Sequence, residues 1–460
     1  MPKAPRIYPL DPRNLTEEQI AVAFAMTSRR PEPFDEIAKI VTTEKAADFH
    51  ERWVLNYGHS SVAEHAIVHM AVENISRLAC DTLEDNRLAS YTEKSSRYQI
   101  IEPGDYYTPG ELDGHPLRRR YVDTCDALFD AYQLLVDGLR QYLAATLPRG
   151  EKERESGFNL RVRRQAIDTA RFLLPTSTLT NVGVTMNARS LEHAIRKLLS
   201  SDLDEERYIG NALKSEGQRI VPTLIKYADR NEYMVATAQV QRDESLPYTE
   251  PANGVAVEAE LVHVDADAEA KIATALLYRF ANQSYLSLWD RVQRMSDEER
   301  RRIIGQSLER LGTHDVPVRE LEMVDYTFDL LMDYGAYREY KRHRIQTYIP
   351  QPPTVEHGYL VPSLVQEAGL QDQFETAMEQ SQDGFHALYP DLPRIAEYLV
   401  THAHKRRVLA KLNLRECYHL FKLRTGPQAH FSLVSVITAA MDKAREKHPN
   451  LFNHLRLRKS

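Results

Sequence analysis

The segment NARSLEH (187–193) has a counterpart later in the chain, NLRECYH (413–419). In each, an asparagine that can cap a helix is followed two positions later by an arginine. A helix start offers unpaired N–H groups and the positive end of the helix dipole, so an anion or a polar ring edge binds well there. One such start is an ordinary cap with a solvated arginine more often than a site, but two in matching context predict a repeated binding feature.

A second pair of segments precedes these two in the same order. EDNRLASYTEKSSRYQ (84–99) lies in the first half, and YKRHRIQTYIPQPPTVEHGYLVP (340–362) lies in the second. Matching order at two places predicts an internal duplication, with each copy of roughly domain size. We expect a first repeat over 1–240, a linker over 241–254 that is rich in polar, Pro and Gly residues, and a second repeat over 255–460.

Helical periodicity dominates both halves. Apolar residues at three-to-four spacing predict helices over 16–30, 61–91, 121–147 and 188–202. Alternation of apolar and polar residues predicts a strand within GVAVEAELVHVDAD (254–267). The predicted fold class is α+β, with two tandem repeats that are each mostly helical and carry a small antiparallel sheet.

Composition narrows the class of protein. The chain has 460 residues and a formal net charge of −7, which argues against nucleic-acid binding through a broad basic face. No apolar run follows the N-terminal lysine, and none approaches membrane-spanning length, so we expect neither a signal peptide nor a membrane partner. Cys80, Cys125 and Cys417 form no C-x-x-C pair, which favours a reducing, cytoplasmic location.

Motifs in both halves resemble one pattern, that of the flavin-dependent thymidylate synthases. The first half carries it in order and spacing at GHSSVAEHA (58–66), NRLASYTEKSSRYQ (86–99), ARFLLP (170–175) and NARSL (187–191). The second half carries it at RHR (342–344), NLRECYHLFKLR (413–424) and QAHF (428–431). The chain therefore resembles a tandem-duplicated member of that family, and the resemblance touches most of its length.

Two family motifs survive in opposite halves. The family's Arg-His-Arg triplet is intact at 342–344, whereas the first half has Asp-Asn-Arg at 85–87. The family's Glu-x-Ser-x-Arg phosphate arm is intact at 93–97, whereas the second half has IPQPPT at 349–354. Each half thus keeps one of the two motifs.

Two arginines divide in the same way. The arginine before the family's Leu-Pro step is Arg171 in the first half and Glu397 in the second, and the later arginine is Leu198 in the first half and Arg424 in the second. In the family, the active site lies between subunits of a homotetramer, and one subunit gives the triplet and late arginine while its neighbour gives the phosphate arm and early arginine. The resemblance implies that the two repeats share one composite site, and that a homodimer forms a pseudo-tetramer.

The resemblance also assigns roles. A pyrimidine nucleotide, with dUMP as the family's substrate, is expected to bind Glu93, Lys94, Ser95, Ser96, Arg97, Arg171, Glu339 and Arg342. FAD is expected to contact His59, Ser61, Asn187, Arg189, His193, His343, Arg344, Asn413, Arg415 and His419. Arg424 is the implied catalytic residue, because a cation near the pyrimidine favours loss of the N3 proton. A methylene group from methylene-tetrahydrofolate goes to C5, and NADPH re-reduces the flavin.

One position departs from the family in a way that leaves the function open. The family has a glutamine three residues before the triplet, where this chain has Glu339. A carboxylate repels a nucleotide phosphate, whereas beside a base it can accept a hydrogen bond. Two alternatives therefore stand beside thymidylate synthesis: a different C5 modification of a pyrimidine nucleotide, and a flavin- or nucleotide-binding protein without turnover.

Other classes of site have weaker signals. EHAIVH (64–69) places His65 and His69 on one face of the expected helix, but no third ligand is positioned in sequence, so we expect no metal. The basic runs RVRRQ (161–165) and HKRRVLAK (404–411) lack interleaved aromatics and are interpreted as solvated helix faces rather than RNA contacts. The sequence has neither G-x-G-x-x-G nor a phosphate-loop motif.

Overall fold

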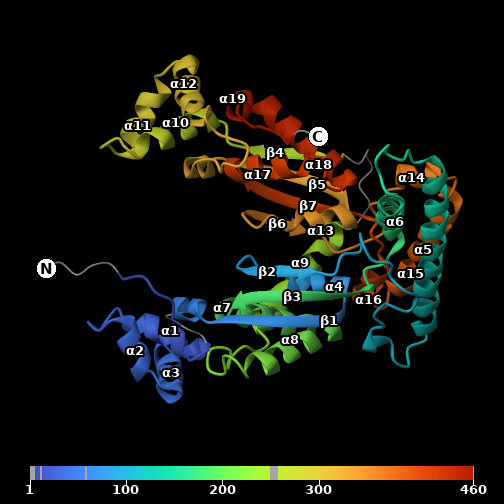
Figure 1. Cartoon of the computed structure of the whole chain (residues 1–460), viewed down its shortest axis with the longest axis horizontal. Coiled ribbons are helices and arrows are strands. Elements are labelled where there is room, and N and C mark those ends of the chain that lie inside the picture. Colours follow the sequence, from blue (N-terminus) through green and yellow to red (C-terminus); the bar gives the residue numbers. More distant parts are fainter. Residues whose placement is uncertain (1–5, 11–12, 57, 59, 249–256, 459–460) are drawn as a thin grey trace.

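Two antiparallel sheets lie one above the other, each with helices on its outer face (Figure 1). The computed structural model describes residues 6–10, 13–56, 58, 60–248 and 257–458. The sheet of the first half has the order β1 (Ile67–Ser76), β3 (Leu179–Asn187), β2 (Ala89–Glu93). The sheet of the second half has the order β4 (Ala259–Val264), β5 (Asp325–Asp333), β7 (Lys405–Asn413), β6 (Gln346–Pro350). The edge strands β2 and β6 face each other at the centre (Figure 1).

Helices make up most of the remaining described chain. Those of the first half are α1 (Glu17–Met26), α2 (Phe34–Ile40), α3 (Thr43–Phe49), a π-helix (His50–Asn56), a 3-10 helix (Ser60–His65), α4 (Arg77–Leu83), α5 (Arg118–Thr146), α6 (Glu155–Ala170), α7 (Ala188–Leu199), α8 (Asp204–Gly217) and α9 (Glu232–Ser245). Those of the second half are α10 (Ala268–Tyr278), α11 (Tyr285–Gln293), α12 (Asp297–Leu308), α13 (Tyr334–Tyr340), α14 (Ser363–Glu367), α15 (Gln371–Leu388), α16 (Pro393–Ala396), α17 (Leu414–Arg424), α18 (Phe431–Lys447) and α19 (Pro449–Phe452). Among the described helices, none combines the length and apolar character that a membrane crossing requires.

The two halves repeat one order of elements, which confirms the predicted α+β class with two tandem repeats. The order β1-α4-β2, then helices, then β3-α7 in the first half recurs as β5-α13-β6, then helices, then β7-α17 in the second. The long helices α5 and α6 of the first half correspond to α15 and α16, which are shorter. Each sheet has a separate hydrophobic core beneath it, so each repeat buries its own apolar face.

Side-chain caps start the helices that the two halves share. The Asn187 side chain accepts a hydrogen bond from the main-chain N–H of Ser190 at 2.8 Å, and Asn413 accepts one from Glu416 at 2.8 Å. Each asparagine is therefore the N-cap of α7 or α17, as the sequence predicts. An extended cap residue also ends the preceding strand, so one residue fixes both the end of β3 or β7 and the start of the next helix.

Two segments that periodicity predicts as helix contain strands. The helix predicted over 61–91 is wrong, because β1 runs through its middle and pairs with β3 along its length. The segment 404–411 is also not a helix face, since most of it belongs to β7, where Arg406 is buried. Short runs rich in Val and Ile satisfy both periodicities, and pairing with neighbouring strands decides between them.

The region between the repeats is only partly described. The helix α9 extends through Ser245 and a 3-10 helix follows over Leu246–Tyr248, while residues 249–256 lie outside the described residues. The strand predicted within 254–267 is confirmed as β4. The predicted repeat limits at 240 and 255 remain predictions.

Reciprocal backbone hydrogen bonds join the repeats at the centre. The N–H of Thr176 donates to the carbonyl of Val400 at 2.8 Å, and the N–H of His402 donates to the carbonyl of Leu174 at 3.0 Å. Thr176 and His402 hold equivalent positions, each eleven residues before its capping asparagine. A second reciprocal pair flanks the first at 3.0 and 2.9 Å: Ser177 N–H to Tyr398 O, and Ala403 N–H to Phe172 O. The repeats therefore meet through a local pseudo-two-fold axis.

The buried ion pairs across this junction join acids of the first repeat to cations of the second. Asp81 of α4 pairs with Lys341 and, at 3.0 Å, with Arg406. Glu93 at the end of β2 pairs with Arg338 of α13. Burial alone would raise the pKa of Asp81, but the charges of Lys341 and Arg406 outweigh it, and the pKa lies below its ordinary value.

We expect Asp81→Asn to lower the free energy of unfolding by about 3–5 kcal/mol, because it leaves Lys341 and Arg406 buried without a counter-charge. Chemical denaturation at pH 7 measures the loss. Asp329→Asn is the matched control, since Asp329 and its partner Arg407 are about one-third exposed, and it should cost less than about 1 kcal/mol. Equal losses in the two variants would show that the charge of Asp81 does not hold the repeats together.

Candidate active site

The turn after β2 brings together several of the predicted phosphate-binding residues. Arg97 Nη2 donates to Asp168 Oδ2 at 2.8 Å, and Arg171 Nε donates to Asp168 Oδ1 at 2.8 Å. Burial would raise the pKa of Asp168, but Arg171 and Arg97 outweigh it and lower that pKa. Ser96 is buried with its Oγ 3.5 Å from Arg171 Nη1, and Ser95 Oγ accepts the N–H of Arg97 at 3.2 Å. Two arginines are therefore aligned by a single carboxylate.

Glu93 connects this turn to the second repeat. Its side chain is 2% exposed, accepts a hydrogen bond from Arg77 Nη1 at 2.7 Å, and pairs with Arg338. The Arg342 guanidinium, the first member of the Arg-His-Arg triplet, approaches the same carboxylate to 3.7 Å. Burial would raise the pKa of Glu93, but Arg338 and Arg77 hold it well below its usual range. The turn near residue 95 and the triplet are thus neighbours within one chain.

The late arginine reaches the same region from α17. Arg424 pairs with Glu339 of α13, and the other oxygen of Glu339 accepts the N–H of His430 at 3.2 Å. Burial lowers the pKa of Arg97, but hydrogen bonding to Asp168 raises it, and Glu339 lies close enough to raise it further. The structure therefore brings together five predicted residues from both repeats: Arg97, Arg171, Glu339, Arg342 and Arg424.

Next to this region, a cavity of about 520 Å³ is bordered by several residues of the predicted flavin set. The predicted residues that line it are His343, Arg344, Arg415 and His419, together with Arg342. Further cations on its wall are Lys422, Arg456 and Arg458, and Ile345 and Leu423 supply apolar surface. Asn413 holds α17 in place as its N-cap. A cationic wall beside apolar surface fits a ligand with both a diphosphate and aromatic rings.

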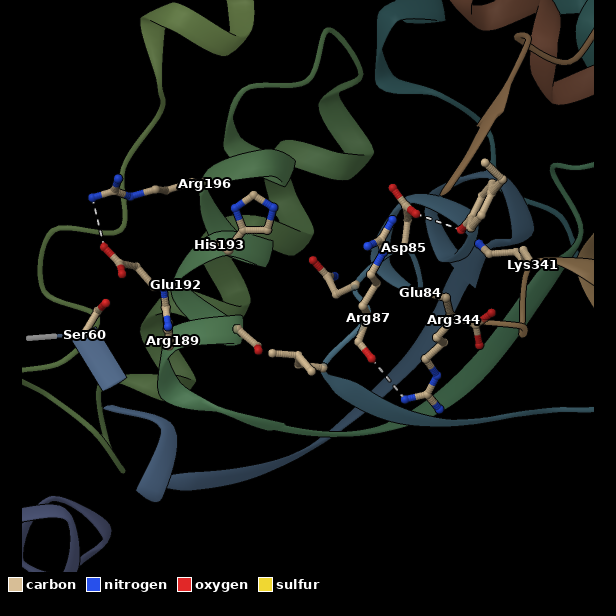
Figure 2. A pocket seen from close by; sticks show the side chains of 14 residues that line it. Ser60, Glu84, Asp85, Arg87, Arg189, Glu192, His193, Arg196, Lys341 and Arg344 are labelled. Carbon is tan, nitrogen blue, oxygen red and sulfur yellow. Dashed lines mark hydrogen bonds and ion pairs between the residues drawn. The ribbon is translucent and has the colours of Figure 1, made fainter. Parts of the chain in front are cut away.

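The equivalent place in the first repeat holds a second cavity, of about 810 Å³. Arg189 and His193 of α7 line it, and Lys341 and Arg344 enter it from the second repeat (Figure 2). Asp85, which replaces the first arginine of the triplet, accepts a hydrogen bond from Tyr348 at 2.8 Å (Figure 2). Arg344 lines both cavities, so the two are not independent.

Three predicted residues stand apart from these groupings. Ser61 is exposed on the 3-10 helix, and Ser60 rather than Ser61 lines the larger cavity. Lys94 donates its main-chain N–H to Asn181 at 2.8 Å, which fixes the backbone after β2. His59 lies outside the described residues.

The pseudo-symmetric counterpart of the arginine region is acidic. Glu397, at the position of Arg171, is buried and hydrogen bonds to Arg394 at 2.6 Å, and burial raises its pKa. Asp81 occupies the position of Arg338, and Glu206 is buried nearby with a hydrogen bond from Thr82 at 2.6 Å. Asp81 and Glu397 are already paired with cations and stand where the other side has Arg338 and Arg171, so this side lacks two arginines that the other side offers to a phosphate.

Sequence reasoning missed five residues that shape the site. Arg77, Asp168, Arg338, Glu416 and His430 contact the predicted residues directly or through one partner. Asp168 could have been found from sequence, since it lies three residues before Arg171 on a helix. The others belong to different elements, and only the tertiary fold brings them together.

The structure also locates the weaker candidates, the His65–His69 pair and the basic run RVRRQ. His65 ends a 3-10 helix and packs on Phe24, whereas His69 lies in β1 and contacts Thr185 Oγ1 at 2.9 Å. The two histidines therefore do not share a helix face. The run RVRRQ does lie on a helix, α6, where Arg161 pairs with Glu153 at 2.7 Å.

One family model matches the chain twice. The model of the family described as thymidylate synthase complementing protein matches residues 13–223 and again residues 260–450. The chain therefore belongs to the thymidylate synthase complementing protein family, and each repeat matches the family model by itself.

Three relatives indicate how the chain compares in length. A UPF0159 protein from Chlamydia muridarum is 32% identical over 425 residues, which cover 88% of this chain and 79% of that protein. A flavin-dependent thymidylate synthase from Clostridium tetani is 29% identical over 214 residues, covering 46% of this chain and 82% of that protein. The solved structure of the flavin-dependent thymidylate synthase ThyX from Helicobacter pylori, complexed with FAD and dUMP, matches with a TM-score of 0.32 and 16% identity over 44% of this chain and 100% of that one.

We expect the free energy of unfolding to fall as the pH drops from about 6.5 toward 3. His430 is buried, and its pKa in the folded protein is lowered to about 3 by burial and by Arg171, whereas an unfolded histidine titrates near pH 6.5. The unfolded chain therefore binds the proton first, so this stability is complete above pH 6.5 and is lost below it. Denaturant titrations at several pH values measure the slope.

His430→Asn should reduce this slope by up to about 1.4 kcal/mol per pH unit, because the variant has no proton to bind at that site. His263→Asn is the control, since His263 is exposed on β4 and should leave the slope unchanged. An unaltered slope in the His430 variant would show that this histidine is not held neutral by the fold.

Proposed function

We propose that the protein methylates a pyrimidine nucleotide at C5, converting dUMP to dTMP, at one composite site between its two repeats. The observation that carries this proposal is that Asp168 holds Arg97 and Arg171 of the first repeat beside Arg338 and Arg342 of the second, which Glu93 holds. Burial lowers the pKa of Arg171, and Arg338 lies close enough for its charge to lower that pKa further. Four guanidinium groups in one region suit a nucleotide phosphate, which they bind through charge-assisted hydrogen bonds. The named activity of the Clostridium tetani relative supports the same function.

FAD is the proposed cofactor, and it supplies the hydride chemistry that no side chain provides. The residues that would hold it are those of the 520 Å³ cavity, with Arg344 and Arg415 offering charge to a diphosphate. On the first repeat, Asn187, Arg189 and His193 would contribute to the same cofactor set at the larger cavity. Methylene-tetrahydrofolate as carbon donor and NADPH as reductant complete the proposal.

Each protein group then has a defined task. Ser95, Ser96, Arg97, Arg171 and Arg342 hold the 5′-phosphate, and Arg424 stabilises the anion that forms when the pyrimidine loses its N3 proton. None of the three cysteines suits a nucleophile, because Cys80, Cys125 and Cys417 are buried thiols whose pKa values are raised by burial. Binding and orientation are therefore the contributions of the protein.

The acidic counterpart side supports a single phosphate site per chain. Asp81 and Glu397 replace the two arginines, equivalent to Arg338 and Arg171, that would hold a second phosphate. We further propose that two chains form a homodimer, which reproduces a tetramer of family-type units, and that the protein acts in the cytoplasm. The repeats are taken as 1–240 and 255–460, joined by 241–254.

Glu339 favours a second candidate. Its ion pair with Arg424 partly neutralises the cation assigned to the pyrimidine, and a carboxylate in place of the family's glutamine can select another ring. A protein that binds flavin and nucleotide without turnover, or that modifies C5 differently, shares all other features of the site.

Redox spectroscopy separates these functions. We expect the purified protein to be yellow, to bleach with NADPH under anaerobic conditions, and to regain its flavin absorbance when dUMP and methylene-tetrahydrofolate are added together. Yellow protein that stays bleached with dUMP would favour the second candidate, and re-oxidation by another pyrimidine nucleotide would identify a different substrate. Colourless protein that binds no added FAD would exclude both.

We expect Arg342→Ala to weaken dUMP binding by about 10- to 100-fold, since a charge-assisted hydrogen bond contributes about 1.5–3 kcal/mol. Its side chain is 57% exposed, so the variant should fold normally. Arg219→Ala is the matched control, because Arg219 is an exposed arginine that pairs with Glu216 and lines neither cavity, and it should change dUMP affinity less than twofold. Calorimetric titration measures both, and equal losses would contradict a composite phosphate site.

A further inference from the structure

Four side chains of the second repeat form one continuous hydrogen-bonded chain. Arg424 Nε donates to His343 Nε2 at 2.8 Å, and His343 Nδ1 lies 2.9 Å from Glu416 Oε1. At the other end, Arg424 pairs through Nη1 with Glu339. The side chains of His343 and Glu416 are only 2% and 6% exposed, so water competes little for these bonds. The chain thus runs from Glu416 at the start of α17 to Glu339 on α13.

The donors in this chain fix the tautomer of His343. An arginine Nε always carries a hydrogen, so His343 Nε2 must be the acceptor. Its one remaining ring proton then sits on Nδ1 and is donated to Glu416. Burial lowers the pKa of His343, which keeps the imidazole neutral as this arrangement requires.

The first repeat lacks all four side chains of this hydrogen-bonded series. The positions equivalent to Glu339, His343, Glu416 and Arg424 are Thr82, Asn86, Ser190 and Leu198. The helix start is the same in both repeats, because Ser190 and Glu416 each donate their N–H to the capping asparagine at 2.8 Å. Asn86 instead donates to the carbonyl of Leu83 at 2.8 Å. The four side chains are thus present together in one repeat and absent together from the other, as expected if they act as one unit.

Metal binding explains the cluster less well. Ligand atoms of His343, Glu416 and His419 lie within 4.8 Å of one another. Both ring nitrogens of His343 already have partners, however, and Arg424 would place a fixed positive charge next to the ion. The hydrogen bonds that run from Glu416 to Glu339 satisfy His343 and Glu416 without an ion.

We propose that Glu416 is a positioning residue that acts through His343 to orient the guanidinium of Arg424 toward the pyrimidine. This inference rests on the role proposed for Arg424 in the preceding section. Two of the three guanidinium nitrogens of Arg424 have partners: Nη1 donates to Glu339 and Nε donates to His343. The third, Nη2, has no hydrogen-bond partner among the described residues. The chain therefore aims one nitrogen of Arg424 at a ligand and limits rotation of its side chain.

A double-mutant cycle tests this role. We expect Glu416→Ser and His343→Asn, which install the residues of the first repeat, each to lower kcat by about 10- to 100-fold, as is usual for residues that orient a functional group. Because Glu416 acts only through His343, the double variant should lose no more than the worse single variant. Losses that multiply would overturn the proposal. Glu416→Asp, which keeps the carboxylate, should recover part of the rate.

Glu269→Ser is the matched control. Glu269 also lies in the first turn of a helix of the second repeat, α10, and accepts a hydrogen bond from Asn450 at 2.9 Å. This partner, Asn450, is not part of the proposed site. We expect the kcat of the Glu269→Ser variant to equal that of the unmodified protein. A similar loss in this variant would show that any glutamate at a helix start affects turnover through stability.

A measurement without substrate separates this inference from the proposed function. Nitrogen-15 NMR of the imidazole rings should show His343 neutral with its proton on Nδ1, and Glu416→Ser should weaken this preference, because only Arg424 then selects the tautomer. An Nε2–H tautomer in the unmodified protein would show that Arg424, His343 and Glu416 are not hydrogen bonded as proposed. The expected tautomer in a protein that does not turn over dUMP would refute the proposed substrate and leave the chain standing. Retention of the signal after zinc addition would argue against the metal alternative, and its loss would favour that alternative and overturn the proposal.

Discussion

The reciprocal backbone hydrogen bonds between Leu174–Thr176 and Val400–His402 are the constraint on which the rest of the structure depends. Because each bond has an equivalent made by the other repeat, the two units can meet in only one relative orientation. That orientation brings β2 and β6 edge to edge and sets α4 against α13 (Figure 1). Backbone groups form these bonds whatever the side chains are, so the junction tolerates large divergence between the repeats.

Side chains break the symmetry that the backbone keeps. On one side of the axis, Glu93 pairs with Arg77, Arg338 and Arg342. Arg342 is exposed, and its guanidinium suits an anion. On the other side, Asp81 pairs with Lys341 and Arg406, and Glu397 pairs with Arg394. A buried acid that is matched by cations adds cohesion, and the same acid excludes a phosphate. One side of the junction thus serves structure, and the other is the side that we propose binds the phosphate.

The proposed site depends on carboxylates as much as on arginines. Asp168 aligns Arg97 with Arg171, Glu93 aligns Arg338 with Arg342, and Glu416 and Glu339 hold Arg424 from two directions. A guanidinium on a long side chain has several rotamers, and a fixed acceptor removes most of them before a ligand arrives. Preorganised cations bind a phosphate more strongly than free ones, because less conformational entropy remains to be lost.

The sequence by itself determined the repeat and the caps at Asn187 and Asn413. It also determined which arginines of the motifs each half carries, because caps and motifs depend on local order along the chain. It failed where long-range pairing decides the outcome. The sequence predicts helix at β1, because its short apolar run fits both periodicities and only pairing with β3 decides for a strand. Only the tertiary structure could bring Glu416 to His343 and Asp81 to Lys341, because these partners are far apart in sequence and no local pattern links them.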